Sequence, residues 1–244
     1  SDLMIIRDQF DPDLRKMIKK KKQIAIIPVG SIEQHGPHLP ISTDSDIVTE
    51  IAIKLSEKID GIVLPTINYG ISDEHFPFFN LSIKKSTLLR ILENVCESLT
   101  KNGIFKILII NGHYGNLDSL KRFERKQKKN RKIKVVSYWK YMDREFDHAG
   151  NVETSIMLAI SKKVNMRKAK KGFQTNGMSK KEISKINKLA QKSFPKVTGN
   201  GVWGDPTKSS STLGRKIIKE VVNNLAKESN LTYRNKTKNS PVNV

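Results

Sequence analysis

The residues most able to do chemistry lie in one short stretch, GSIEQHGPHLPISTD, at residues 30–44. Glu33 and His35 are two positions apart, so their side chains point to the same side wherever the chain is extended. Asp44 opens the helical pattern that follows. An imidazole and two carboxylates, held by a glycine and prolines, are ligand types that suit a divalent metal ion. The alternative is an ordinary polar loop in which Asp44 caps the next helix.

Two later segments add candidates. His113 lies in NGHYGN, residues 111–116, whose glycines let the backbone turn sharply. His148 and Glu153 lie in DHAGNVETS, residues 147–155. An imidazole with an ordinary pKa of about 6.5 exchanges protons near neutrality, so we expect His148 to be catalytic and Glu153 to orient it or to bind metal. The alternative for His113 is a solvent-exposed histidine in a turn. The alternative for Glu153 is a carboxylate that balances the helix dipole.

A fourth loop, GISDEHFP at residues 70–77, places polar groups beside aromatic ones. We expect Ser72 and His75 to contact a substrate. An aromatic wall for the same pocket is available from Phe76, Phe78 and Phe79. A role in packing alone explains these phenylalanines equally well.

The elements that must position these residues alternate between short apolar runs and longer amphipathic segments. The apolar runs predict strands at residues 24–29, 62–64, 105–110 and 133–138. Apolar residues at helical spacing predict helices over 44–59, 86–101, 116–129, 153–161 and 209–226. This alternation predicts an α/β fold, a single-domain, doubly wound and mostly parallel sheet flanked by helices on both faces. Such sheets bind ligands at the carboxyl ends of their strands, which is where the histidine-containing segments fall.

The chain is predicted to divide into a domain and a tail. Residues 1–227 form the α/β domain, and within it residues 162–200 are rich in lysine and poor in apolar positions, which is typical of a basic surface excursion. Residues 228–244 are predicted to be a polar flexible tail.

Composition excludes several classes of protein. The 244 residues include 45 Lys and Arg against 24 Asp and Glu, a formal net charge of +21, yet the 37% of hydrophobic residues is too high for a wholly disordered chain. The single cysteine, Cys96, rules out an internal disulfide. No apolar run approaches the ~20 residues that span a bilayer, so we expect no membrane partner and a cytoplasmic location. No aromatic residues are interleaved with the dispersed basic ones, so a nucleic-acid partner is not expected.

Together, GSIEQHGPHLPISTD, NGHYGN and DHAGNVETS resemble the creatininase family of metal-dependent amidohydrolases. The motifs occur in the family's order over residues 30–155, and the later GDP at residues 204–206 also matches. The resemblance implies a doubly wound α/β domain, two divalent metal ions per subunit and a homo-oligomer, usually a hexamer.

The resemblance also implies roles for single residues. The implied metal ligands are Glu33, His35, Asp44 and His113. In this pattern Asp44 bridges the two ions, Glu33 and His113 bind one of them, and His35 binds the other. Tyr114 matches a substrate-contacting tyrosine, and His148 matches the catalytic histidine. The ligand types fit zinc, manganese or iron.

Two positions depart from creatininase itself. Its second segment has a glutamate ligand two residues after the histidine, where this chain has Gly115. Its substrate-gripping tryptophan, before the catalytic histidine, corresponds to a position at or near Arg144, and Trp139 lies too far upstream to align with it. Both changes argue against creatinine as the substrate.

We therefore expect a metal-dependent amidohydrolase that cleaves a non-peptide C–N bond, in a cyclic amide or a formamide, with a water activated by two metal ions. The family includes an archaeal deformylase of a formylaminopyrimidine ribonucleotide. A phosphorylated small-molecule substrate of that kind would find candidate contacts in Arg144 and Lys140. The alternatives are a two-metal phosphatase or nuclease, which uses the same ligand types, and a non-catalytic basic module that binds nucleic acid or another partner.

Overall fold

The structure, a computed structural model, describes residues 5–20, 23–127 and 130–233. These residues contain a four-stranded parallel sheet in the order β2-β1-β3-β4. The strands are β1 (Ile24–Val29), β2 (Gly61–Val63), β3 (Lys106–Asn111) and β4 (Lys132–Ser137). The central pair, β1 and β3, runs in register from Ile24 opposite Lys106 to Val29 opposite Asn111.

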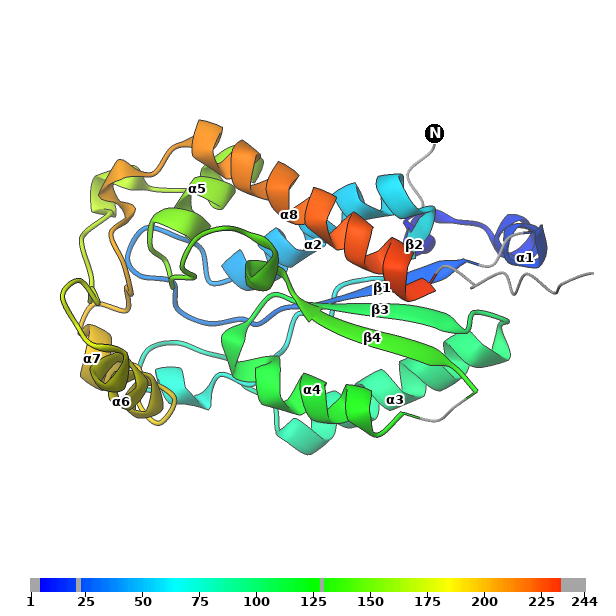
Figure 1. Ribbon diagram of the computed structural model, residues 1–244, viewed down its shortest axis with the longest axis horizontal. Helices are drawn as coiled ribbons and strands as arrows, with labels where there is room; N and C mark the ends of the chain where they lie inside the picture. The colour runs from blue at the N-terminus through cyan, green and yellow to red at the C-terminus, as the bar shows by residue number, and fades with distance from the viewer. Residues whose placement is uncertain (1–4, 21–22, 128–129, 234–244) are drawn as a thin grey trace, which may run out of the picture.

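Helices cover both faces of the sheet (Figure 1). They are α1 (Asp11–Lys20), α2 (Thr43–Ile59), α3 (Lys85–Lys101), α4 (Leu117–Arg125), α5 (Asn151–Ile160), α6 (Lys180–Ala190), α7 (Pro195–Thr198) and α8 (Ser211–Tyr233). Short 3-10 turns lie at Ile6–Asp8, Asp73–His75, Tyr114–Asn116, Tyr138–Tyr141, Met166–Lys168 and Pro206–Lys208. The predicted α/β class is confirmed. Within the described part of the chain, every helix is too short or too polar to cross a membrane.

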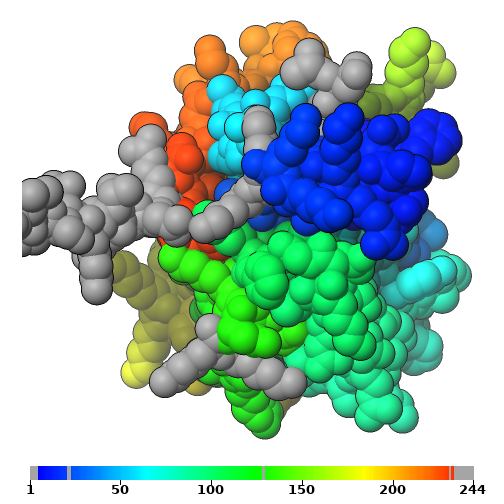
Figure 2. All heavy atoms as spheres, turned by 90° about the vertical axis from the view of Figure 1, so that its right-hand side faces the viewer, coloured from blue at the N-terminus to red at the C-terminus, as the bar shows by residue number. Residues whose placement is uncertain are grey.

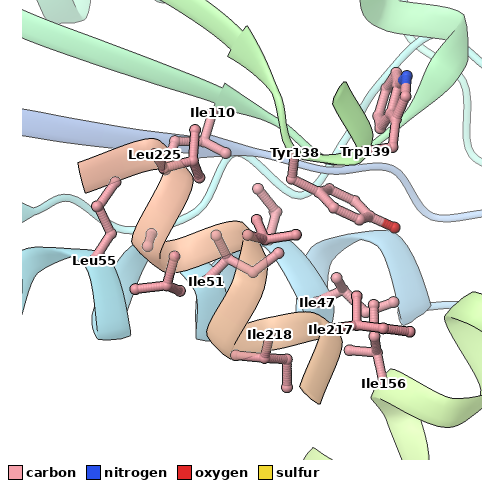
Figure 3. Packing of buried hydrophobic residues seen from close by; sticks show 14 of the residues in the cluster. Ile47, Ile51, Leu55, Ile110, Tyr138, Trp139, Ile156, Ile217, Ile218 and Leu225 are labelled. Atoms are coloured by element: carbon pink, nitrogen blue, oxygen red, sulfur yellow. The ribbon is translucent and has the colours of Figure 1, made fainter. Parts of the chain in front are cut away.

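The two central strands, β1 and β3, are apolar over most of their length because both sides of the sheet are buried there, whereas the edge strand β4 carries Lys132 and Lys134. Ile26 and Leu108 point to the face covered by α2, α5 and α8, whereas Ile27 and Ile109 point to the face covered by α3 and α4. Figure 3 shows the first of these cores, in which α2 and α8 pack beneath the sheet through Ile47, Ile51, Leu55, Ile217, Ile218 and Leu225.

The path of the chain decides where a site can form. From β1 the chain passes through α2 to β2 on one side, and then through α3 to β3 on the other side of β1. The carboxyl ends of β1 and β3 therefore bound the crevice in which open parallel sheets bind ligands. Asn116 closes the base of this crevice, because its side chain accepts from the Ile71 N–H and donates to the Gly30 carbonyl, each at 3.0 Å.

The two ends of the sheet differ. Helices α6 and α7 lie at the carboxyl end, and α1 lies at the amino end (Figure 1). Leu14, Met17 and Ile18 of α1 pack against the second core. Figure 2 looks onto this amino end and shows α1 (blue) packed beside α3 (green). The carboxyl end is therefore the one that carries the candidate site.

The boundary of the predicted tail changes. Helix α8 continues to Tyr233, so residues 228–233 are helical and are not part of a flexible tail. The physical reason is that the Tyr233 ring is buried in the first core and its hydroxyl donates to the Ile107 carbonyl at 2.6 Å. The rest of that prediction, residues 234–244, lies outside the described residues.

Candidate metal centre

Four of the five histidines converge at the carboxyl end of the sheet. The ring centroids of His35 and His148 are 4.2 Å apart, those of His75 and His148 are 5.0 Å apart, and His113 lies 6.3 Å from His75. The fifth, His38, is elsewhere, with its Nε2 2.9 Å from the Thr154 hydroxyl on α5. Loops after β1, β2, β3 and β4 each contribute one of the four rings.

Glu33, Asp44 and His113 form a first group of possible metal ligands, whose ligand atoms all lie within 4.8 Å of one another. His113 Nδ1 is 2.9 Å from Asp44 Oδ2 and 3.2 Å from Glu33 Oε1. On the opposite side of the ring, Nε2 is 2.8 Å from the Ile71 carbonyl. Because a carbonyl only accepts, Nε2 carries a proton, and in the neutral imidazole Nδ1 presents its lone pair to the two carboxylates.

His35, Asp44 and Glu153 form a second group by the same logic. His35 Nε2 is 3.0 Å from Asp44 Oδ1 and 3.5 Å from Glu153 Oε2. Its Nδ1 donates to the Glu33 carbonyl at 3.1 Å, which leaves Nε2 as the ligating nitrogen of the neutral ring. The two groups share Asp44, each of whose oxygens faces a different histidine.

The electrostatics of both groups favour a positive charge between the carboxylates. Burial opposes protonation of His35, but Asp44 and Glu153 outweigh it and raise the pKa of His35 to about 10. Burial opposes protonation of His113 too, and Glu33 and Asp44 raise the pKa of His113 well above its usual value. Burial, together with the charges of Asp44 and Asp147, raises the pKa of Glu153 far above its usual range. Both carboxylates of the second group can be charged at once only beside more positive charge than one imidazolium supplies.

The buried oxygens of these carboxylates are a second indication that the site binds a cation. Both Glu33 oxygens, Asp44 Oδ2 and Glu153 Oε1 are buried without a hydrogen-bond partner. Their contacts with imidazole nitrogens are short but lack the direction of a hydrogen bond. An unsatisfied buried acceptor costs about 1–3 kcal/mol, and more when it is charged. Coordination to divalent ions satisfies all four atoms, so the residues present fit such ions.

The loop before α5 sets the position of Glu153. Asp147 accepts from the Val152 N–H at 2.7 Å and from the Glu153 N–H at 3.3 Å, which caps the helix. Glu153 Oε2 accepts from the Ala149 N–H at 2.7 Å, and Oε1 is left free. This role of Asp147 was not predicted, although an aspartate shortly before a helix is a recognisable capping signal.

His75 and His148 belong to two further groups of possible ligands, Glu33 with Glu74 and His75, and Glu33 with His35 and His148. Gln34 lies between the two rings. The Gly36 N–H donates to Gln34 Oε1 at 2.9 Å, which identifies the other end of the amide as the NH₂. This NH₂ donates to His75 Nδ1 at 2.9 Å. It also lies 3.1 Å from His148 Nε2, but that nitrogen donates to the Gln34 main-chain carbonyl at 3.0 Å, so the lone pair of the neutral His148 ring is on Nδ1. Burial lowers the pKa of His148 well below its usual value, and the neighbouring His35 and His75 add to this effect. His148 is therefore neutral and able to accept a proton.

A pocket of about 360 Å³ opens beside the ligand groups. Its aromatic wall consists of Tyr114, Trp139, Phe146, Phe194 and Trp203. Trp139 stacks on Phe146 with ring centroids 4.5 Å apart, and Tyr114 lies 6.1 Å from Trp139. Trp139 belongs to the same buried cluster as its neighbour Tyr138, but the two rings point in different directions (Figure 3). The motif comparison gave Trp139 no role at the site, because alignment by position does not reveal which way a side chain points.

The residues predicted to contact substrate fall into two sets. Tyr114 and His75 line the pocket. Ser72 does not, because it is fully buried and its N–H donates to the Ser82 hydroxyl at 3.0 Å. The predicted aromatic wall of phenylalanines is also absent from the pocket: Phe76 and Phe79 are 74% and 57% exposed. The loop turns outward after His75, and neighbouring aromatic residues give no sequence signal of that direction.

Residues 162–200 do more than extend the surface. Helix α6 within them begins with a capping box between Ser179 and Glu182. Ile183 and Asn187 on its inner side line the pocket, as does Phe194 after it. The Phe194 ring lies 4.6 Å from the His75 ring and 4.7 Å from the His148 ring. This wall of the pocket was not predicted, because the many lysines of residues 162–200 obscured the apolar spacing of α6.

The parallel sheet and its flanking helices define an α/β protein. The overlapping carboxylate–histidine groups at its crevice define a candidate metal centre. A family model described as "Creatininase: Creatinine amidohydrolase" matches residues 8–228. The chain belongs to the creatininase family.

Three relatives illustrate the range of the family. The "Mycofactocin precursor peptide peptidase" of Mycolicibacterium smegmatis is 29% identical over 221 residues, which cover 83% of each chain. A "2-amino-5-formylamino-6-ribosylaminopyrimidin-4(3H)-one 5'-monophosphate deformylase" of Methanococcus maripaludis is 31% identical, over 85% of this chain and 94% of that one. The "Creatinine amidohydrolase" of Pseudomonas putida is 26% identical, over 56% and 64%.

Solved structures show the same fold. A creatinine amidohydrolase (creatininase) matches with a TM-score of 0.77 at 19% identity, over 96% of this chain and all of that one. A putative creatinine amidohydrolase from Bacteroides fragilis matches with a TM-score of 0.78 at 22% identity, over 97% and 99%. Other matching creatininase structures are described as a Zn–Zn type and as a manganese form.

Proposed function

We propose that this protein is a two-metal amidohydrolase that cleaves the C–N bond of a small-molecule amide in the aromatic pocket. The observation that carries the proposal is the sharing of Asp44 between two ligand groups, each with an imidazole whose far nitrogen is bound to a backbone carbonyl. A carboxylate with one oxygen on each side is suited to bridging two divalent ions. The names of the relatives, an amidohydrolase, a deformylase and a peptidase, support C–N bond hydrolysis.

Each residue of the two groups has a defined part in this proposal. One ion would be held by Glu33, Asp44 and His113, and the other by His35, Asp44 and Glu153. When bound, the two ions lower the pKa of a water between them and polarise the amide carbonyl. The Ile71 and Glu33 carbonyls keep the two imidazoles in the ligating tautomer. The donor set fits zinc, manganese or iron.

His148 supplies the proton that the leaving nitrogen needs, because an amide anion is a very poor leaving group. The ring is neutral, lines the pocket and lies 3.8 Å from Glu33 Oε1. It can take a proton from the attacking water and pass it to the nitrogen of the breaking C–N bond. The Gln34 main-chain carbonyl, which accepts from His148 Nε2 at 3.0 Å, and the Phe194 ring hold the imidazole in place.

The substrate in this proposal is a non-peptide amide, either cyclic or a formamide, because the pocket is small and walled by aromatic rings. A formylaminopyrimidine nucleotide remains a candidate through its formamide group, but its phosphate gains no support from the expected contacts. Arg144 and Lys140 do not line the pocket, and Arg144 Nη2 instead lies 3.7 Å from Glu220 Oε2 on α8. The same finding counts against a phosphatase or nuclease. The homo-oligomer and the cytoplasmic location stay predictions.

Two histidine variants test the proposal. His113→Ala should lose bound metal, whereas His148→Ala should keep its metal and lose turnover by about 10²–10⁴-fold. Metal content is measured by mass spectrometry after gel filtration, and turnover is measured against creatinine, hydantoins and formylaminopyrimidine nucleotides. His38→Gln, outside the pocket, serves as the control and should keep both properties. Full metal content and full turnover in both alanine variants would show that the site is wrongly assigned.

A further inference from the structure

The group formed by Glu33, Glu74 and His75, here called the third group, has the same composition as the two groups assigned to metal ions. Each of the three contains two carboxylates and one imidazole. In the third group, His75 Nε2 lies 3.0 Å from Glu33 Oε2 and 4.0 Å from Glu74 Oε1. Glu33 Oε2 is buried without a hydrogen-bond partner. By residue type alone, the third group would hold a metal ion as well as the other two.

The third group differs in the partner of the far ring nitrogen. In His113 and His35 this nitrogen donates to a main-chain carbonyl, so the nitrogen that faces the carboxylates has the lone pair. In His75 the far nitrogen is Nδ1, and it accepts from the Gln34 NH₂ at 2.9 Å. A neutral imidazole carries one proton, which must then be on Nε2. His75 therefore turns an N–H, and not a lone pair, towards the carboxylates of its group.

The direction of the Gln34 amide is fixed by its surroundings. The Gly36 N–H donates to Gln34 Oε1 at 2.9 Å, and a backbone N–H can only donate. Rotating the amide by half a turn would bring its NH₂ against this N–H, so two donors would face each other. A Cβ at Gly201 would clash with Gln34 Oε1, which shows how closely that loop packs against the amide.

The backbone of Gln34 and the ring of His75 are held as well. The Gln34 N–H donates to the Phe79 carbonyl at 2.8 Å, and the Gln34 carbonyl accepts from His148 Nε2 at 3.0 Å. Gln34 is only 8% exposed. The His75 ring lies 4.6 Å from the Phe194 ring, and each of its nitrogens has a polar neighbour at 2.9 or 3.0 Å. Neither partner is thus free to change its orientation.

We propose that Gln34 closes the third group to metal ions, because its amide keeps a proton on the His75 nitrogen that faces Glu33 and Glu74. The inference rests on the proposed function, since it concerns how many ions the same site holds. An ion in the third group would share Glu33 with the ion of the first group. Its exclusion keeps the Glu33 carboxylate for that first ion. Gln34 is therefore a positioning residue that acts through His75.

Gln34→Glu tests this inference by a gain of metal. The substitution exchanges the NH₂ for an oxygen and keeps the shape of the side chain. The carboxylate accepts from the Gly36 N–H and also from a proton on His75 Nδ1, so the lone pair of His75 moves to Nε2. We expect the zinc content to rise from two ions per chain in the unmodified protein to three in the variant. Mass spectrometry after gel filtration measures this content.

Matched variants locate the additional ion. Adding His75→Ala or Glu74→Gln to Gln34→Glu should return the zinc content to two ions per chain. Asn102→Asp, at an exposed position at the end of α3, adds the same charge far from the sheet's carboxyl end and should also bind two.

Crystals of the zinc-loaded protein test the same point without any substitution. We expect anomalous peaks in the first and second groups of the unmodified protein and none beside His75 Nε2. In Gln34→Glu a further peak should appear between His75 Nε2 and the Glu33 and Glu74 carboxylates.

The outcomes separate this inference from the proposed function. A peak beside His75 Nε2 in the unmodified protein overturns the inference, because the third group is then open with Gln34 in place. A folded Gln34→Glu variant that still binds two ions overturns the role of the amide and leaves the two-metal site intact. If the unmodified protein binds fewer than two ions, the proposed function is contradicted and this inference falls with it.

Discussion

At His113 and His35, hydrogen bonds to main-chain carbonyls determine which ring nitrogen can bind a metal. Each ring donates its far N–H to a main-chain carbonyl, of Ile71 in one case and of Glu33 in the other. A carbonyl cannot exchange roles from acceptor to donor, so both tautomers are fixed before any ion arrives. The residue types could be predicted from the sequence, but the ligating nitrogens could not, because they depend on loops that are distant along the chain.

Metal binding should release protons. Burial lowers the pKa of His35, but Asp44 and Glu153 outweigh it and raise the pKa to about 10, and the pKa of His113 is also raised. A raised pKa means that each ring keeps its proton as the pH rises through neutrality, so a cation must displace that proton at neutral pH. Affinity for zinc or manganese should therefore increase as the pH rises towards 10.

Calorimetry in two buffers with different ionisation enthalpies measures this release directly. We expect the heat of metal binding at pH 7.5 to differ between the buffers by an amount that corresponds to about two protons per chain. Equal heats in both buffers would mean that the imidazoles are already unprotonated, contrary to the electrostatics of the two groups.

Gly115→Ala should weaken metal binding without replacing a ligand. The new Cβ would clash with the Ile71 carbonyl oxygen and would lie 2.5 Å from His113 Nε2, so the hydrogen bond that fixes the His113 tautomer is broken. Loss of such a supporting contact typically costs 10–100-fold in metal affinity. A metal titration against a chromogenic chelator measures the change.

Gly177→Ala is the matched glycine control for that experiment. Its φ is +78°, so alanine is strained there, but nothing lies within 4 Å of the added Cβ. This variant should lose stability and keep its metal affinity. A metal affinity for Gly115→Ala equal to that of Gly177→Ala would contradict the role of the Ile71 contact.

Among the elements, the buried strands were the easiest to predict. Residues 24–29 form β1 with the predicted bounds, and β3 is shifted by one residue. Both consist mainly of apolar residues rich in isoleucine, which is typical of strands that are buried on two faces. Helix α1 has no buried residues and was not predicted, and α6 was hidden by its lysines. These helices depend on tertiary contacts, which an amphipathic pattern alone does not reveal.

Tyr233→Phe should test the end of α8. The variant loses the 2.6 Å hydrogen bond to the buried Ile107 carbonyl and keeps the packed ring. We expect the free energy of unfolding to fall by about 1 kcal/mol, with a further cost if the carbonyl stays unsatisfied. Urea denaturation measures the change. Tyr69→Phe, at a side chain that is 51% exposed, should have almost no effect, and an equal loss in both variants would argue against the buried bond.

For the whole molecule, the positive charge of the surface could be predicted from the sequence, but the position of the basic side chains around the site could not. The described residues that line the pocket include no lysine or arginine, but Lys180 and Lys188 line an adjoining hollow that shares Tyr114 with it. The convergence of four loops on one crevice could be anticipated, because parallel strands end at a common edge. The direction of Trp139, Glu74 and Phe194 could not, since it depends on how residues 162–200 fold back over that edge.

The sharing of Asp44 by two ions is tested most directly by anomalous diffraction from crystals of the zinc- or manganese-loaded protein. We expect two anomalous peaks per chain, roughly 3.5–4 Å apart, on either side of the Asp44 carboxylate. One peak should lie beside His113 Nδ1 and the other beside His35 Nε2. A single peak, or a pair of peaks that Asp44 does not bridge, would contradict the two-metal centre.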